Sequence, residues 1–97
     1  MAFKYTLLKQ DGTIEDLGTR KEKMSLKELQ SVVNGLIEII PTAYYKEGFN
    51  PKAVVYGNEE ARFSELNYRN PHFKVLFDDY GYPWDVFGDY LKEEAVR

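Results

Sequence analysis

The chain has no cysteine, one histidine and one tryptophan among its 97 residues. Without cysteine it cannot form a disulfide, a thiolate zinc site or a cysteine nucleophile, and the composition suits a reducing compartment. Any zinc site or serine–histidine–aspartate triad would have to use His72. No apolar run is long enough to cross a membrane, and the first residues lack the pattern of a signal peptide. We therefore expect a cytoplasmic protein with no membrane segment.

Hydrophobic residues make up 43% of the chain and aromatic residues 15%, which is enough for one hydrophobic core. A chain of this length buries roughly 60–65% of the surface that its unfolded form exposes, so little apolar material is left for a second core. The net charge of −3 is modest, and so many aromatic residues argue against a disordered chain. The composition predicts a single domain over residues 1–97 and excludes a multidomain enzyme.

The clearest local pattern predicts an amphipathic helix over residues 25–34. Ser25 and Glu28 have the spacing of a capping box, in which each side chain accepts a hydrogen bond from the other residue's backbone N–H. Gly35 is expected to end the helix in the left-handed conformation. Hydrophobic residues recur every three or four positions, as they do along one face of a helix: Leu26, Leu29, Val32, Val33 and Leu36.

Strand patterns lie on both sides of this helix. Asp11-Gly12 separates residues 3–9 from a second strand that Gly18 ends, and predicts a hairpin. Residues 36–40 (LIEII) resemble a central strand, because aliphatic side chains occupy both faces, and Pro41 ends it.

The second half of the chain is less regular. Residues 53–56 and 63–67 are expected to form a hairpin with its turn at residues 57–60, although residues 59–66 could also make a short helix. Residues 86–91 are expected to form a last strand followed by a frayed, charged tail. Asn70-Pro71 predicts a second, short helix over residues 70–77, with asparagine as the cap. The whole pattern predicts an α+β fold, in which a single mixed or antiparallel sheet of about four to six strands is packed by the main helix and the short second one.

Signatures of enzymes are missing. There is no GxxxxGK[ST] and no GxGxxG phosphate-binding motif. The adjacent carboxylates Asp78-Asp79 and Glu59-Glu60 could bind a divalent cation, but neither has calcium-loop spacing, and solvated loop charge explains them more simply. We expect no metal, no cofactor and no catalytic residue; a small hydrolase would have to use His72 with a carboxylate.

Aromatic residues gather late in the chain, and Tyr80, Tyr82 and Trp84 alternate through residues 78–85. Aromatic side chains in a polar loop either cover the core or contact a partner, and both interpretations stay open here. The three aspartates of this loop would repel phosphates, which argues against nucleic acid as the partner. A small nucleotide is an alternative ligand, with arginines on its phosphates: Arg20, Arg62 or Arg69.

Glu38 is the one charged residue in LIEII, so it must be paired, neutralised or exposed to solvent. A solvent-facing strand position or a salt bridge to the basic segment before the helix explains it; a polar contact in a binding surface is the alternative. Asn58, Glu59 and Asn67 flank the predicted hairpin and could join such a surface, although turn chemistry also accounts for asparagines there.

One segment, Leu29-Gln30-x-x-Val33-x-Gly35-x-Ile37-Glu38, resembles a family of small proteins encoded by phages, plasmids and other mobile elements. That family is known only as a domain of unknown function. The resemblance covers about residues 24–91 and continues through Asn58-Glu59, Asn67 and Gly88-Asp89. It implies that the positions of interest are Gln30, Glu38, Asn58, Glu59 and Asn67.

This context favours a small, non-catalytic accessory protein that binds a host protein. The surface that we expect to make the contact is the aromatic loop at residues 78–85 together with exposed polar groups of the sheet. A binder of a small nucleotide or signalling molecule is the alternative, and a hydrolase using His72 is the weakest one. Small sheets with open edges also pair readily, so a homodimer is a further expectation.

Overall fold

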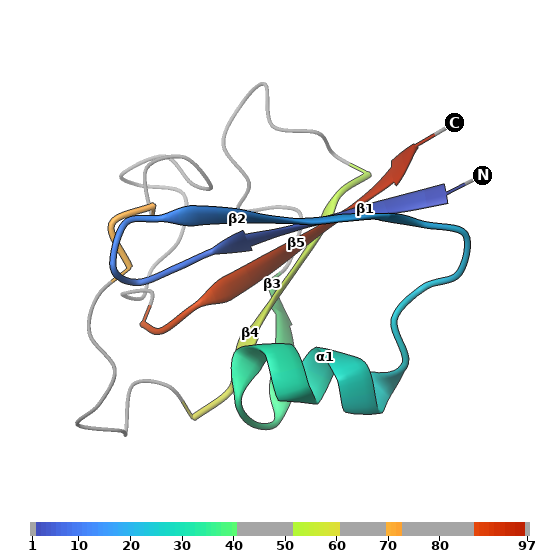
Figure 1. Ribbon diagram of the computed structural model, residues 1–97. Helices are drawn as coiled ribbons and strands as arrows, with labels where there is room; N and C mark the ends of the chain where they lie inside the picture. The colour runs from blue at the N-terminus through green and yellow to red at the C-terminus, as the bar shows by residue number, and fades with distance from the viewer. Residues whose placement is uncertain (1, 41–51, 61–69, 73–86, 97) are drawn as a thin grey trace.

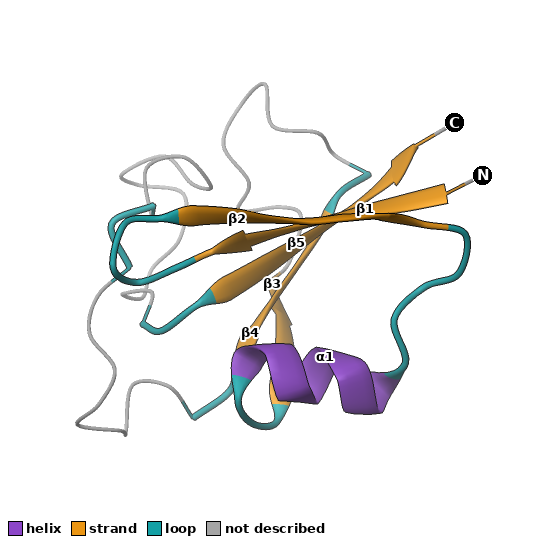
Figure 2. Cartoon of the chain, in the orientation of Figure 1, coloured by secondary structure: helices purple, strands orange, loops and turns teal. Residues whose placement is uncertain are grey.

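The computed structural model describes residues 2–40, 52–60, 70–72 and 87–96 (Figures 1 and 2). The elements are β1 (Ala2–Leu8), β2 (Ile14–Arg20), α1 (Leu26–Val33), β3 (Ile37–Ile40), β4 (Val54–Asn58) and β5 (Tyr90–Val96). The five strands form one antiparallel sheet in the order β2-β1-β5-β4-β3, and α1 packs on one face of it. The predicted α+β class, with a single sheet and a main helix, is confirmed.

The centre of the sheet is β5, which pairs with β1 on one side and with β4 on the other. The prediction that the chain frays after residue 91 is therefore wrong. The run Lys92-Glu93-Glu94 has the composition of a solvated tail, but it lies between two neighbouring strands. Those neighbours come from distant parts of the sequence, since Tyr5 lies opposite Glu93, and no local pattern could show the pairing.

The predicted central strand at residues 36–40 lies instead at the edge of the sheet, as β3. Ile40 is buried, whereas the neighbouring Ile39 is exposed. Both faces of β3 are apolar, and this composition alone suggested burial on both sides.

The strand that pairs with β3 is β4, which runs through Gly57 and Asn58; both positions were predicted to be in the turn. Its expected hairpin partner at residues 63–67 lies outside the described residues. Within the part of the chain that the structure describes, β4 pairs with β3 and β5.

The capping box at the start of α1 is confirmed. The Glu28 N–H donates to Ser25 Oγ, and the Ser25 N–H donates to a Glu28 carboxylate oxygen; each donor–acceptor distance is 3.2 Å. The end of the helix differs from the prediction, because Asn34 and not Gly35 is the left-handed residue, with a φ of 62°.

Glycine at position 35 makes room for a neighbouring side chain. A Cβ atom there would lie 2.8 Å from Nδ2 of Asn58, closer than such contacts normally come. That amide nitrogen donates to the carbonyl oxygens of Val33 at 3.2 Å and Asn34 at 3.1 Å. Asn58 therefore caps the end of α1 from β4, and the close approach depends on the missing side chain of Gly35.

The hairpin between β1 and β2 is confirmed around Asp11-Gly12, where the Gly12 N–H donates to the Lys9 carbonyl oxygen. The second strand does not end at Gly18 but continues to Arg20. The register with β1 shifts between Tyr5 and Thr6, and Gly18 lies at this bulge with a φ of 87°, a value that suits glycine.

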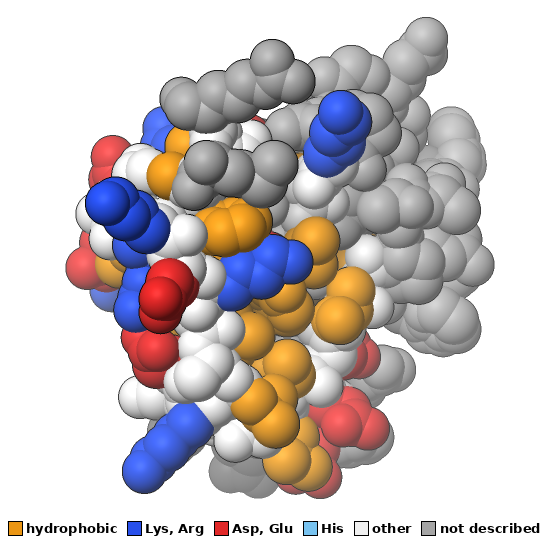
Figure 3. Space-filling view, turned by 90° about the vertical axis from the view of Figure 1, so that its right-hand side faces the viewer, with side chains coloured by type: hydrophobic (Ala, Val, Ile, Leu, Met, Phe, Trp, Pro, Cys, Tyr) orange, Lys and Arg blue, Asp and Glu red, His pale blue; other side chains and the backbone are white. Residues whose placement is uncertain are grey.

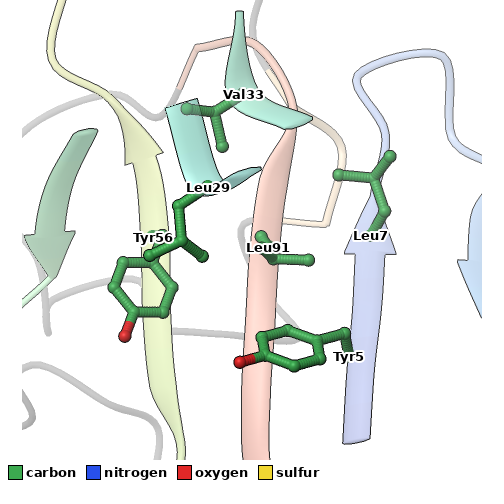
Figure 4. Close-up of a cluster of buried hydrophobic side chains, with 6 residues drawn as sticks. All are labelled: Tyr5, Leu7, Leu29, Val33, Tyr56 and Leu91. Carbon is green, nitrogen blue, oxygen red and sulfur yellow. The ribbon is translucent and has the colours of Figure 1, made fainter. Parts of the chain in front are cut away.

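The core under α1 is a cluster of six side chains: Tyr5, Leu7, Leu29, Val33, Tyr56 and Leu91. Leu29 and Val33 project from the helix toward the sheet, and the Tyr5 ring lies with its hydroxyl over β5 (Figure 4). The opposite face of the sheet also buries side chains, among them Leu8, Val55 and Tyr90. Both faces of the sheet therefore contribute to the interior.

Of the second helix predicted at residues 70–77, the structure describes residues 70–72. Asn70 Oδ1 accepts the His72 N–H at 2.8 Å, the contact of an Asx turn. The Asn70 side-chain nitrogen donates to the carbonyl oxygens of Leu8 and Gly88, and the residue is only 1% exposed. Asn70 thus joins the end of β1 to the segment that leads into β5. No helix in the described ranges is long and apolar enough to cross a membrane.

We expect Gly35→Ala to destabilise the fold by about 1–2 kcal/mol, because the new Cβ displaces the Asn58 amide from its two carbonyl acceptors. In an Asn58→Ala background the same change should be neutral or stabilise the protein by up to about 1 kcal/mol, because alanine lowers the conformational entropy of the unfolded chain. Urea unfolding of the four proteins measures the coupling. An equal cost of Gly35→Ala in both backgrounds would contradict this account.

Candidate functional site

Four of the predicted binding residues lie near the end of α1: Gln30, Glu38, Asn58 and Glu59. Their described contacts hold the fold together. The Gln30 carbonyl oxygen accepts the N–H groups of Asn34 and Gly35, and the Glu59 N–H donates to the Leu36 carbonyl oxygen at 2.8 Å. The Asn58 side chain donates to the helix end and accepts the Glu60 N–H.

The Glu38 side chain points to the opposite face of the sheet from the Asn58 side chain. Its neighbours in β3, Ile37 and Ile39, are opposite Asn58 and Tyr56 on the helix side of the sheet. Because side chains alternate along a strand, Glu38 points to the face that α1 does not cover. The structure thus brings these positions together in space without directing their side chains at a common ligand. The other predicted binding residues lie outside the described residues: Asn67, Tyr80, Tyr82 and Trp84.

The groups proposed for the alternative functions have structural contacts where the structure describes them. Nε2 of His72 lies 3.3 Å from the Thr13 carbonyl oxygen. Arg20 forms an ion pair with Glu28 at 2.6 Å, and this contact lowers the pKa of the Glu28 carboxyl group. Arg62 and Arg69 lie outside the described ranges. The described residues contain no group of three or more histidines and carboxylates that could hold a metal ion.

A buried carboxylate that the sequence did not indicate lies at the centre of the sheet. Glu93 Oε2 accepts a hydrogen bond from the Tyr5 hydroxyl at 2.6 Å and a longer one from the Tyr56 hydroxyl at 3.5 Å. Nζ of Lys23 lies 3.9 Å from the other oxygen. Only 4% of the Glu93 side chain is exposed, so the carboxylate is not accessible to a ligand in solution.

Tyr5 connects this carboxylate to the segment before the helix. Its hydroxyl donates to Glu93 and accepts the Met24 N–H at 2.8 Å. Burial, together with the hydrogen bond to Glu93, raises the pKa of Tyr5 to about 12. Lys23 precedes Met24 in the chain, and its Nζ atom lies over the Phe3 ring, 5.4 Å from the ring centroid. These contacts fix the start of α1 against the sheet.

The remaining candidate is an apolar surface on the helix side of the sheet. Leu26 is 58% exposed and Ile39 is 60% exposed. Four partly buried side chains that pack against the core cluster lie on the same side of the sheet. Together with Leu26 and Ile39 they make up what we call the helix-side surface: Met24, Leu26, Val32, Ile37, Ile39 and Val54. Figure 3 shows hydrophobic side chains in a strip that runs through the middle of this view to its lower edge, with charged side chains beside it.

The sequence pattern contained part of this signal. Leu26 belongs to the same helical stripe as the buried Leu29 and Val33. Periodicity shows which side of a helix is apolar but not how far the sheet extends beneath it, so the exposure of Leu26 could not be predicted.

Comparisons with protein-family models, with curated proteins and with solved structures gave no match to this chain. The resemblance to a family of mobile-element proteins therefore stays a prediction made from the residues alone.

We expect Tyr5→Phe to destabilise the protein by about 1–3 kcal/mol at neutral pH, because it leaves the Met24 N–H without its acceptor and removes the shortest hydrogen bond to Glu93. The pKa of Tyr5 is about 12 in the folded state, against an ordinary value of 10.0 for tyrosine, so its contribution to stability is complete below pH 10 and is lost as the pH rises through 12.

Urea unfolding of both proteins across this range measures the effect. The difference in unfolding free energy between wild type and Tyr5→Phe should shrink above pH 10, and the contributions of groups that the two proteins share cancel in it. A difference that stays constant to pH 12 would show that the Tyr5 hydroxyl is not held as described.

Proposed function

We propose that this protein is a small, non-catalytic binding module that contacts a partner protein through the helix-side surface. The observation that carries the proposal is the exposure of Leu26 and Ile39 beside partly buried apolar side chains. Soluble proteins rarely leave such side chains gathered on one surface unless the surface makes contacts. Partner proteins cover surfaces of this kind with apolar groups at the centre and polar groups at the rim.

The charge beside this surface indicates the chemistry of the partner. Residues 20–28 carry four basic and two acidic side chains, in a chain whose net charge is −3. Arg20 is paired with Glu28 and Lys23 with Glu93, which leaves Lys21 and Lys27 against Glu22. A protein with an apolar contact area bordered by carboxylates would complement both features.

The proposed biological role is that of an accessory factor from a phage or other mobile element, acting on a host protein. The support for this origin is the resemblance of residues 24–91 described above. The absence of a catalytic role is part of the same proposal: the ionisable groups at the centre of the described sheet hold the fold together, as Glu93 and Tyr5 do.

Affinity capture from the source cell, with Leu26→Ser and Ile14→Ser as a matched pair, tests the contact surface. Both side chains are exposed to nearly the same degree, 58% and 60%, but Ile14 lies on β2 at the far edge of the sheet. We expect a protein retained by wild type and by Ile14→Ser to be lost with Leu26→Ser, and its retention to weaken as salt rises. Retention by all three proteins would show that the helix-side surface is not the contact.

The nucleotide alternative is tested separately by thermal-shift measurements with a panel of nucleotides. A ligand at one hundred times its dissociation constant should stabilise the folded state by about 2.7 kcal/mol. Since Arg20 is already paired with Glu28, we expect no shift in melting temperature. A clear rise with any one nucleotide would favour the alternative over a protein partner.

A further inference from the structure

The hydrogen bonds of β3 show which of its backbone groups face outward. The Glu59 N–H donates to the Leu36 carbonyl oxygen, so this opposed pair is of the hydrogen-bonded kind. Such pairs alternate along an antiparallel ladder, and Glu38–Gly57 and Ile40–Val55 are therefore hydrogen-bonded too. Between them, Ile37 and Ile39 direct their N–H and C=O groups away from β4. Among the described strands, β3 has no neighbour on that side.

The two edges of the sheet differ in how they are protected. Edge strands commonly avoid pairing with other chains by carrying charges, prolines or bulges. The β2 edge has such features: Glu15, Asp16 and Arg20 are exposed, and a bulge interrupts the strand at Gly18. The β3 edge has an unbroken register with β4, one charged residue, and the exposed side chain of Ile39.

A second copy of β3 fits this edge in a register centred on Ile39. When two antiparallel copies meet with Ile39 opposite Ile39, the outward N–H and C=O groups of both residues bond to each other. The two exposed isoleucines then cover each other on the helix side. Glu38 lies opposite Ile40 in this arrangement, so the two carboxylates are not directly opposed.

The neighbouring symmetric register, centred on Glu38, is disfavoured by charge. It sets Ile37 opposite Ile39, so it uses the same outward backbone groups. It also sets the two Glu38 carboxylates directly opposite each other, in a non-hydrogen-bonded pair whose side chains lie close together. Charge therefore favours the pair centred on Ile39.

We propose that two copies of this chain pair through the outer edge of β3, with Ile39 on the two-fold axis, to form one continuous ten-stranded sheet. Both helices then lie on the same face of that sheet, because residues directly opposed across a ladder share a face. The dimer joins the two helix-side surfaces at Ile39. The dimer forms from two copies of this chain alone, so it does not depend on the partner protein proposed above.

Sedimentation of the purified full chain over a range of concentrations tests the dimer. We expect the mass to rise with concentration toward twice the 11.4 kDa of the chain. Ile39→Lys should remain a monomer, and Ile14→Lys, at an equally exposed position on β2, should dimerise like wild type. A wild-type monomer at all concentrations, or an Ile39→Lys dimer, would overturn the proposal.

The register is tested with single cysteines, which a cysteine-free chain makes simple. Hydrogen-bonded opposed residues have Cα atoms about 5.5 Å apart, which is within the range of a disulfide. Under mild oxidation Ile39→Cys should form a covalent dimer rapidly, whereas Ile14→Cys, at an equally exposed position on β2, should do so only slowly. Equal rates at the two positions would exclude the Ile39-centred pair.

A failed dimer test would leave the proposed protein partner intact, because the capture experiment depends on Leu26. Conversely, a dimer that forms as described while Leu26→Ser captures the same proteins as wild type would support the pairing of β3 and refute the proposed contact surface.

Discussion

The hydrogen bond from the Tyr5 hydroxyl to the Glu93 carboxylate is the contact on which the arrangement of this molecule depends. It is buried at the centre of the sheet, beside the segment that leads into α1, where an unpaired carboxylate would be costly. Tyr56 and Lys23 add weaker contacts, and the Tyr5 oxygen also accepts the Met24 N–H. One polar cluster thus fixes the pairing of β1 with β5 and the place where the helix begins. The apolar side chains of α1 then pack beside it.

Features that depend on neighbouring residues could be predicted from the sequence. The capping box of Ser25 and Glu28 and the hairpin at Asp11-Gly12 involve residues that are close in the chain, and both are confirmed. The positions of β3 and β5 in the sheet could not be predicted, because they depend on pairings between distant segments. A charged run such as the one around Glu93 has the same composition in a solvated tail and in a central strand.

The candidate site shows the same division. Asn58 was singled out as a binding residue, and the structure gives its amide a role in capping α1. Such a role requires Gly35 on one segment and an asparagine on another, and a single sequence gives no sign that the two meet. The exposure of Leu26 and Ile39 depends likewise on how far α1 and its neighbours extend over the sheet, which periodicity does not contain.

The pairing of Ala2 with Val96 places the first and last described residues side by side (Figure 1). The sheet consists of two strand pairs, β2–β1 and β4–β3, with β5 between them. The two ends lie next to each other on the neighbouring strands β1 and β5. Any polypeptide fused to either end would leave the molecule from the same place. A short linker between the two ends would turn β5 and β1 into a simple hairpin, and the contact between residues 5 and 93 would become local along the chain. Because loop closure is costly for distant residues, a chain closed by this linker should fold faster than the open chain.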